Sequence, residues 1–222
     1  MTAPRTASAA GLRLIGHSGL GGHGDGMQVI RHGGALYVGH TGTTGAGTSV
    51  LDVTDPSRPV LVTQWPAPPR SHTHKVQVAD GLLLVNHEKF PYRAPDSGPV
   101  SAGLAVYRLD DPLRPSQVAF WPSTGRGVHR VVWTGGRYAH MSAIPGGFRD
   151  RIWVVLDLAD PAHPAEVARP PPAGHHGRGG RARATTSSRA GPLASGTRPI
   201  TRSSPETGPI SATTMQGSSC ST

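Results

Sequence analysis

The stretch VLDVTDPSRPVLVTQW, residues 50–65, decides the fold. Two apolar, β-branched runs flank an aspartate-proline turn, a pattern typical of antiparallel strands joined by a short connection. Related stretches follow as VYRLDDPLRPSQVAFW at residues 106–121 and VVLDLADPAHPAEVARP at residues 154–170. Because aspartate accepts hydrogen bonds from nearby backbone N–H groups and proline presets φ, we interpret the shared Asp-Pro-x-x-Pro as turn chemistry rather than as a catalytic series. It comprises Asp55, Pro56 and Pro59, then Asp111, Pro112 and Pro115, then Asp160, Pro161 and Pro164.

A second pattern precedes each of these stretches. It reads MQVIRHGGALYVGH from residue 27, HKVQVADGLLLVNH from residue 74 and HRVVWTGGRYAHMS from residue 129. Each predicts a hairpin centred on a glycine, at Gly34, Gly81 and Gly136. The two patterns together predict four short strands in each unit of about 50 residues, which is typical of a β-propeller blade. The sequence therefore predicts an all-β fold, a partial β-propeller of about three four-stranded blades spanning residues 23–69, 70–125 and 126–175.

The segments SVLDVTDPSRPVLV, AVYRLDDPLRPSQVAF and WVVLDLADPAHPAEVA resemble the LVIVD repeat of bacterial β-propeller proteins. The resemblance covers roughly residues 23–170, and its Asp-Pro-x-x-Pro core is more specific than its strands. It implies the propeller fold. It implies no particular activity, because that family has no settled one to transfer.

Composition excludes several other classes of protein. Thirty glycines and 22 prolines in 222 residues favour turns over helices, and no apolar run is long enough for a membrane helix. The start lacks the apolar core of a secretory signal, and the single Cys220 excludes an internal disulfide framework, so we expect a cytoplasmic protein. The net charge of +9 includes six arginines and one glutamate within residues 170–222. The body is only mildly basic, so no nucleic-acid or membrane partner is expected.

The end of the chain departs from the repeat. Residues 17–175 form the expected propeller region and residues 1–16 a loosely ordered start, but residues 176–222 lack Val, Phe, Tyr and Trp. Such a composition favours disorder. When the codons from Ser195 onward are read one base out of step, one consistent choice of wobble bases gives a strand, a Gly-Asp turn and further strands in the order of the repeat. We therefore expect an out-of-frame fourth repeat, and the nucleotide sequence tests this expectation. A disordered basic tail and an unrelated linker are the alternatives.

Histidine is abundant, with twelve in the chain, and its placement follows the repeat. His74 and His129 stand seven residues before the turn glycines of their repeats, and His72 shares a strand face with His74 if that strand is regular. Innermost strands of a propeller line its axis, so these imidazoles could converge on a divalent transition metal. A structural role, in which the histidines hydrogen-bond neighbouring loops, is the alternative. The candidate metal-ligating residues are His72, His74, His129, His23, His87 and Glu88.

These observations leave two functions open for the repeat region, and we expect the chain as given to be a truncated fragment of a protein with one of them. One is a binding or scaffold protein whose face presents loops to a protein partner or a small molecule. The other is a metal-dependent enzyme of redox or hydrolytic type, an analogy at the level of fold. No G-x-S-x-G motif or comparable nucleophile pattern occurs, so no catalytic residue is assigned. Three blades alone would also leave unpaired strand edges, so we expect poor solubility of the isolated chain.

Overall fold

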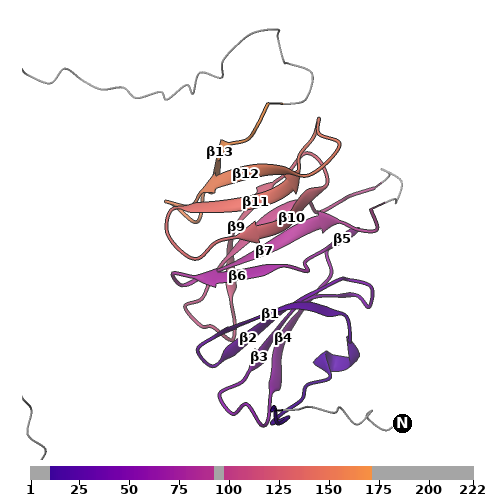
Figure 1. Ribbon diagram of the computed structural model, residues 1–222, viewed down its shortest axis with the longest axis vertical. Helices are drawn as coiled ribbons and strands as arrows, with labels where there is room; N and C mark the ends of the chain where they lie inside the picture. The colour runs from indigo at the N-terminus through magenta and orange to yellow at the C-terminus, as the bar shows by residue number, and fades with distance from the viewer. Residues whose placement is uncertain (1–10, 93–97, 172–222) are drawn as a thin grey trace, which may run out of the picture. The chain divides into compact units, whose positions relative to one another are not determined.

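The computed structural model describes residues 11–92 and 98–171, and it confirms the all-β class with antiparallel sheets (Figure 1). The strands form three up-and-down groups of four, which we call the first, second and third meanders. The first comprises β1 (Gly26–His32), β2 (Ala35–His40), β3 (Ala46–Asp52) and β4 (Val60–Pro66). The second comprises β6 (Val76–Ala79), β7 (Leu82–Lys89), β8 (Gly103–Arg108) and β9 (Ser116–Pro122). The third comprises β10 (Gly127–Val132), β11 (Tyr138–Ile144), β12 (Ile152–Asp157) and β13 (Ala165–Ala168).

The connection between the third and fourth strand of each meander is the Asp-Pro-x-x-Pro turn. The aspartate side chain accepts a hydrogen bond from the backbone N–H two residues later, over 2.9–3.0 Å, at Ser57, Leu113 and Ala162. The aspartate carbonyl also accepts from the residue three positions on, over 3.0 Å. The repeated motif thus supplies the same local acceptors three times, which is why one sequence pattern yields one connection. The residues are Asp55, Pro56 and Pro59, Asp111, Pro112 and Pro115, and Asp160, Pro161 and Pro164.

Apolar side chains alternate along the strands and form cores between successive meanders. Tyr37 and Val50 of the first meander pack in one cluster with Leu83 and Val85 of the second. The opposite face of β7 contributes Leu84 to a larger cluster with the third meander. Each internal face of the second meander is therefore buried by a neighbour.

The second and third meanders are joined at one point of backbone pairing. Gly127 of β10 pairs with Glu88 of β7. Gly127 has φ of 90°, and an added Cβ would lie 2.1 Å from the His87 carbonyl oxygen. Only glycine permits this approach of the two strands, which brings the start of β10 to the end of β7.

The remaining described segments are short. A 3-10 turn, η1 (Leu20–Gly22), precedes the first meander, and Leu20 packs against the outer face formed by Val38 and Leu51. Strand β5 (Ser71–His72) pairs with the far end of β7. No helix among the described residues is long and apolar enough to cross a membrane. The expected out-of-frame segment, residues 176–222, lies outside the described residues, as do residues 1–10 of the expected loose N-terminus.

Candidate metal centre

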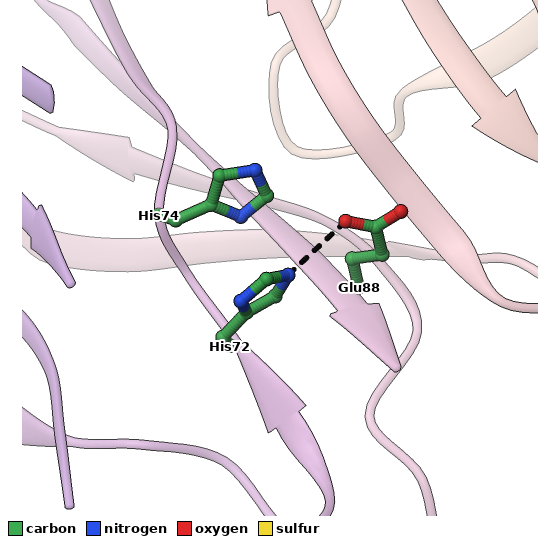
Figure 2. A group of neighbouring side chains, drawn as sticks. All are labelled: His72, His74 and Glu88. Atoms are coloured by element: carbon green, nitrogen blue, oxygen red, sulfur yellow. Dashed lines mark hydrogen bonds and ion pairs between the residues drawn. The ribbon is translucent and has the colours of Figure 1, made fainter. Parts of the chain in front are cut away.

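His72, His74 and Glu88 meet beside the junction of β7 and β10 (Figure 2). One ligand atom from each lies within 4.8 Å of the others, and all three side chains are buried. His72 is opposite Glu88 because β5 pairs with β7 in that register. The strand containing His72 ends there, so His74 lies in the connection to β6 rather than on a regular strand. The two rings nevertheless remain 4.0 Å apart between centroids.

Glu88 is the hub of the group and is fully buried. Its Oε2 lies 3.1 Å from Nε2 of His72 and 2.9 Å from Nδ1 of His129, and it accepts a 3.2 Å hydrogen bond from the Tyr92 hydroxyl. Burial alone would raise the pKa of Glu88, but its close contacts with the His72 and His129 rings outweigh the effect of burial and hold the pKa below its ordinary value. This shift favours the ionised carboxylate of Glu88, whose Oε1 is buried without a hydrogen-bond partner among the described residues.

His129 reaches the group from the third meander. It occupies a β-bulge, because the pairing of β10 with β11 shifts register between Val128 and Arg130. Met27 occupies the corresponding bulge in the first meander, between Gly26 and Gln28. The bulge leaves an extra residue in the strand and re-aims its side chain. That side chain is 19% exposed, whereas Glu88 is inaccessible, so His129 marks the more open side of the group.

The surroundings of His72 fix the roles of its ring nitrogens. Nδ1 lies 3.2 Å from the carbonyl oxygen of Thr41, which can only accept, so Nδ1 carries a proton. In the neutral ring Nε2 is then an acceptor, and it faces the carboxylate oxygen of Glu88, also an acceptor. Two acceptors this close require a cation that both can share, either a proton on Nε2 or a metal ion.

His74 supplies a further lone pair. Burial, followed by the charge of His72, lowers the pKa of His74 to about 3, so its ring is neutral at pH 7. The Asn86 amide is oriented by two hydrogen bonds of 2.7 Å, accepting from Lys75 N–H and donating to the Val128 carbonyl. Its nitrogen can therefore only donate to Nδ1 of His74, 3.3 Å away, which selects the tautomer with the lone pair on Nδ1. Nδ1 of His74 therefore carries a lone pair that accepts the Asn86 hydrogen bond, and a metal ion bound at Nδ1 would replace Asn86 as its partner.

The other two candidates are not in the group. His87 precedes Glu88 on β7 and lies on the opposite face, where Nδ1 is 2.8 Å from the Ser101 hydroxyl and burial lowers the His87 pKa to about 4. His23 lies in the first meander, with Nδ1 3.0 Å from the Thr44 hydroxyl. The structure thus brings together His72, His74, His129 and Glu88.

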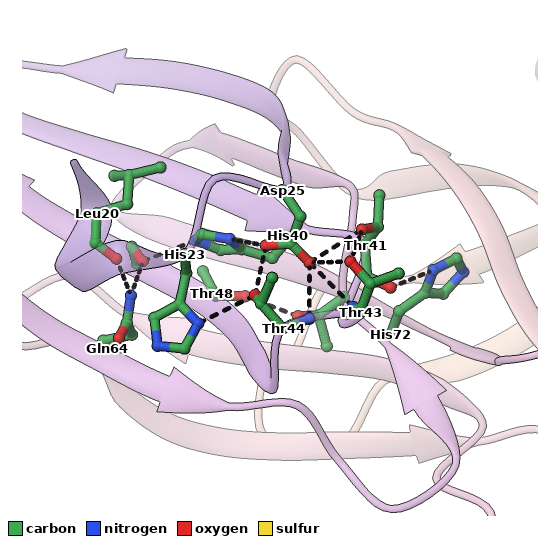
Figure 3. Close-up of polar contacts among 12 residues, drawn as sticks. Leu20, His23, Asp25, His40, Thr41, Thr43, Thr44, Thr48, Gln64 and His72 are labelled. Atoms are coloured by element: carbon green, nitrogen blue, oxygen red, sulfur yellow. Dashed lines mark hydrogen bonds and ion pairs between the residues drawn. The ribbon is translucent and has the colours of Figure 1, made fainter. Parts of the chain in front are cut away.

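A second polar network supports the site from the first meander (Figure 3). Nδ1 of His40 lies 2.8 Å from Asp25, and Nε2 lies 2.8 Å from the Ser49 hydroxyl. The order Asp-His-Ser resembles a hydrolase triad, but Ser49 and His40 are both fully buried, so no substrate reaches the hydroxyl. Asp25 also accepts from the Thr41 hydroxyl, over 3.0 Å. The network therefore fixes the position of Thr41, whose carbonyl oxygen faces Nδ1 of His72.

Tyr92, Arg151, Asn86 and the Thr41 carbonyl were not predicted from the sequence as parts of the site. No motif marks them. Asn86 and Tyr92 flank Glu88 in the sequence, whereas Thr41 and Arg151 come from the first and third meanders, the latter with Nη2 3.7 Å from Oε1 of Glu88. A scan of the chain against protein-family models found no match, and a search of curated proteins found no relative.

Proposed function

We propose that this chain is part of an LVIVD-repeat-like β-propeller and that it acts as a scaffold for a divalent transition metal held by His72, His74 and Glu88. The propeller assignment is supported by three consecutive four-stranded meanders with the same connection and by the burial of one meander against the next. The metal assignment is supported by the site chemistry.

The observation that carries the metal proposal is the facing pair of acceptors, Nε2 of His72 and Oε2 of Glu88, 3.1 Å apart in a buried site. A proton could satisfy this pair alone. A proton would leave the buried Oε1 of Glu88 without a hydrogen-bond partner among the described residues, whereas a metal ion accepts several donors at once. Two imidazoles and one carboxylate form a ligand set that suits zinc or iron(II).

The surroundings resemble the outer shell of protein metal sites. The Thr41 carbonyl accepts from Nδ1 of His72 and so directs Nε2 inward. His129 and the Tyr92 hydroxyl hold the Glu88 carboxylate. A bound metal would supply Lewis acidity, and a redox or hydrolytic reaction is the alternative function that such a centre would permit.

The test is metal uptake by the full chain after chelator treatment, measured by calorimetry and elemental analysis with Zn²⁺ and Co²⁺. We expect one equivalent per chain. His74→Gln should lower affinity by more than the roughly 10- to 100-fold typical of losing an outer-shell partner. His87→Gln is the matched control, because His87 lies next to Glu88 on β7 and is half-buried but lies outside the group.

The two interpretations of the cluster give different results. A protonated His72–Glu88 ion pair requires neither His74 nor metal, so stoichiometric uptake that is lost in His74→Gln supports the metal centre. Absence of uptake by the folded wild-type chain would instead establish the histidines as a structural tie between the second and third meanders.

A further inference from the structure

The more open side of the proposed metal centre carries a cation. Arg151, immediately before β12, has its Nη2 3.7 Å from Oε1 of Glu88 and 3.4 Å from Nδ1 of His129. Its side chain is 39% exposed, against 0% for Glu88. The guanidinium therefore lies between solvent and the buried carboxylate.

The contacts with Glu88 and His129 do not give the paired N–H groups of the Arg151 guanidinium well-formed hydrogen bonds. The distance to Glu88 exceeds a hydrogen bond, and Nδ1 of His129 already faces Oε2 of Glu88 at 2.9 Å. A ring nitrogen that donates its proton to Glu88 cannot also accept from Arg151. The guanidinium is thus close to the centre while its preferred partner, a bidentate oxyanion, is missing from its described contacts.

The charge balance points in the same direction. Among the described residues, Glu88 supplies the carboxylate of the group, and the other two candidate ligands are imidazoles. A divalent ion bound there would therefore leave a net positive charge. Arg130, next to His129 on β10, lines the same surface hollow as Arg151 and adds a second positive charge there. A positive centre beside an accessible guanidinium favours an anionic ligand.

We propose that Arg151 and the metal centre together bind a small oxyanion, a carboxylate or phosphate group whose oxygens bridge the guanidinium and the metal. This inference rests on the proposed metal site and names its ligand class. Arg151 is the specificity-determining residue. His72, His74 and Glu88 hold the ion.

The experiment uses the full chain loaded with Co²⁺, whose visible absorption reports changes in its ligands. Oxalate and inorganic phosphate are the two probes, and chloride is the control anion. We expect saturable spectral shifts with oxalate and phosphate. Arg151→Gln should weaken their binding at least about tenfold, the loss of one charge-assisted contact, and should not lower Co²⁺ affinity, because it removes a positive charge 3.7 Å from Glu88. Arg151→Lys should fall between, because it keeps the charge and loses the fork.

Arg149→Gln is the matched control, since it removes the same charge from an exposed position in the same connection. Equal oxyanion binding by wild type and Arg151→Gln, or an equal loss in Arg149→Gln, would overturn the oxyanion inference and leave the metal site standing. A chain that is folded but takes up no Co²⁺ would overturn both. A shift with only one of the two probes would assign the site to that oxyanion.

Discussion

The carbonyl oxygen of Thr41 lies 3.2 Å from Nδ1 of His72, and this contact connects the first meander to the candidate metal centre. The hydroxyl of the same threonine donates to Asp25 over 3.0 Å. The loop that carries Thr41 is thus held by a carboxylate, and its backbone in turn fixes the proton on His72. Stability of the first meander and chemistry of the centre are coupled through one residue.

Asp25→Asn is expected to lower both the stability of the first meander and the metal affinity of the centre. Asp25 accepts from His40, from the Thr41, Thr43 and Thr44 hydroxyls and from two backbone N–H groups, and an amide nitrogen in place of one carboxylate oxygen would face donors. We expect a loss of about 2–3 kcal/mol in the free energy of unfolding, since hydrogen bonds to charged groups contribute about 1.5–3 kcal/mol each. Denaturant titration measures it. Metal affinity should fall as well, and an unchanged affinity in the folded variant would separate the two networks.

The same carboxylate predicts a loss of stability in acid. Burial alone would raise the pKa of Asp25, but hydrogen bonds from His40, Thr44, Thr43 and Thr41 lower it well below 3.8. A depressed folded pKa contributes stability that is fully present above the unfolded value and is lost as pH falls through the folded value. Unfolding free energy should therefore decline below about pH 4. The decline should be shallower in Asp25→Asn, and parallel curves for the two proteins would contradict this assignment.

Tyr37 ties the first meander to the second. Its buried hydroxyl donates to the Pro112 carbonyl over 2.7 Å, within the Asp-Pro turn of the next repeat, and its environment raises the Tyr37 pKa to about 12, chiefly through burial. Tyr37→Phe should cost about 1–2 kcal/mol, since the ring still fills its place but the carbonyl loses its partner. Tyr138→Phe, at a 45% exposed position, is the control and should change stability little. Equal effects of the two substitutions in denaturant titrations would argue against the tie.

Gly127 should be the glycine least tolerant of substitution at the junction. Gly127→Ala combines φ of 90° with a Cβ 2.1 Å from the His87 carbonyl oxygen, so the strands must separate, and we expect a loss of roughly 3 kcal/mol or more. Gly81→Ala is matched, with φ of 72° but no atom within 4 Å of the added Cβ, and should cost about 1–2 kcal/mol. Of the two variants, only Gly127→Ala should also lose metal uptake. Similar losses for both would show that φ alone matters there.

The sequence anticipates what is local and repeated. Asp-Pro-x-x-Pro places its acceptor and its fixed φ within four residues, so three copies predict three connections and the strands around them. The repeat predicts that His72, His74 and His129 lie close together on innermost strands. The three residues do lie together, but His74 is in the connection between β5 and β6 and His129 is in a bulge. His87 could have been separated from Glu88 by the period of two along a strand, which puts adjacent residues on opposite faces.

The remaining parts of the site depend on contacts that no local pattern encodes. Arg151 contacts Glu88 of the second meander from the third meander, and Thr41 contacts His72 from a loop 31 residues earlier in the sequence. The bulge that re-aims His129 is a register shift of one residue between β10 and β11. Such shifts arise from the packing of whole strands and leave little trace in residue types.

The outer face of the third meander should cause self-association. The corresponding face of the second meander is buried by its neighbour, whereas Val132 and Trp153 are 62% and 56% exposed on the third. Exposed apolar sheet faces of this kind favour association in water. We expect sedimentation velocity to show species larger than a monomer that increase with concentration. Trp153→Lys should reduce them, because a charged side chain would have to be desolvated in the contact.

Leu12→Lys is the control for this effect. Leu12 is 81% exposed in the segment before η1, so the substitution changes charge and exposed apolar area without touching the third meander. If exposed apolar area anywhere on the chain drove association, both variants would reduce it equally. If the sheet face drives it, only Trp153→Lys will. A wild-type chain that sediments as a monomer at every concentration would contradict the prediction and would mean that the stacked His140 and Trp153 rings, 5.5 Å apart, protect this face well enough without a neighbour.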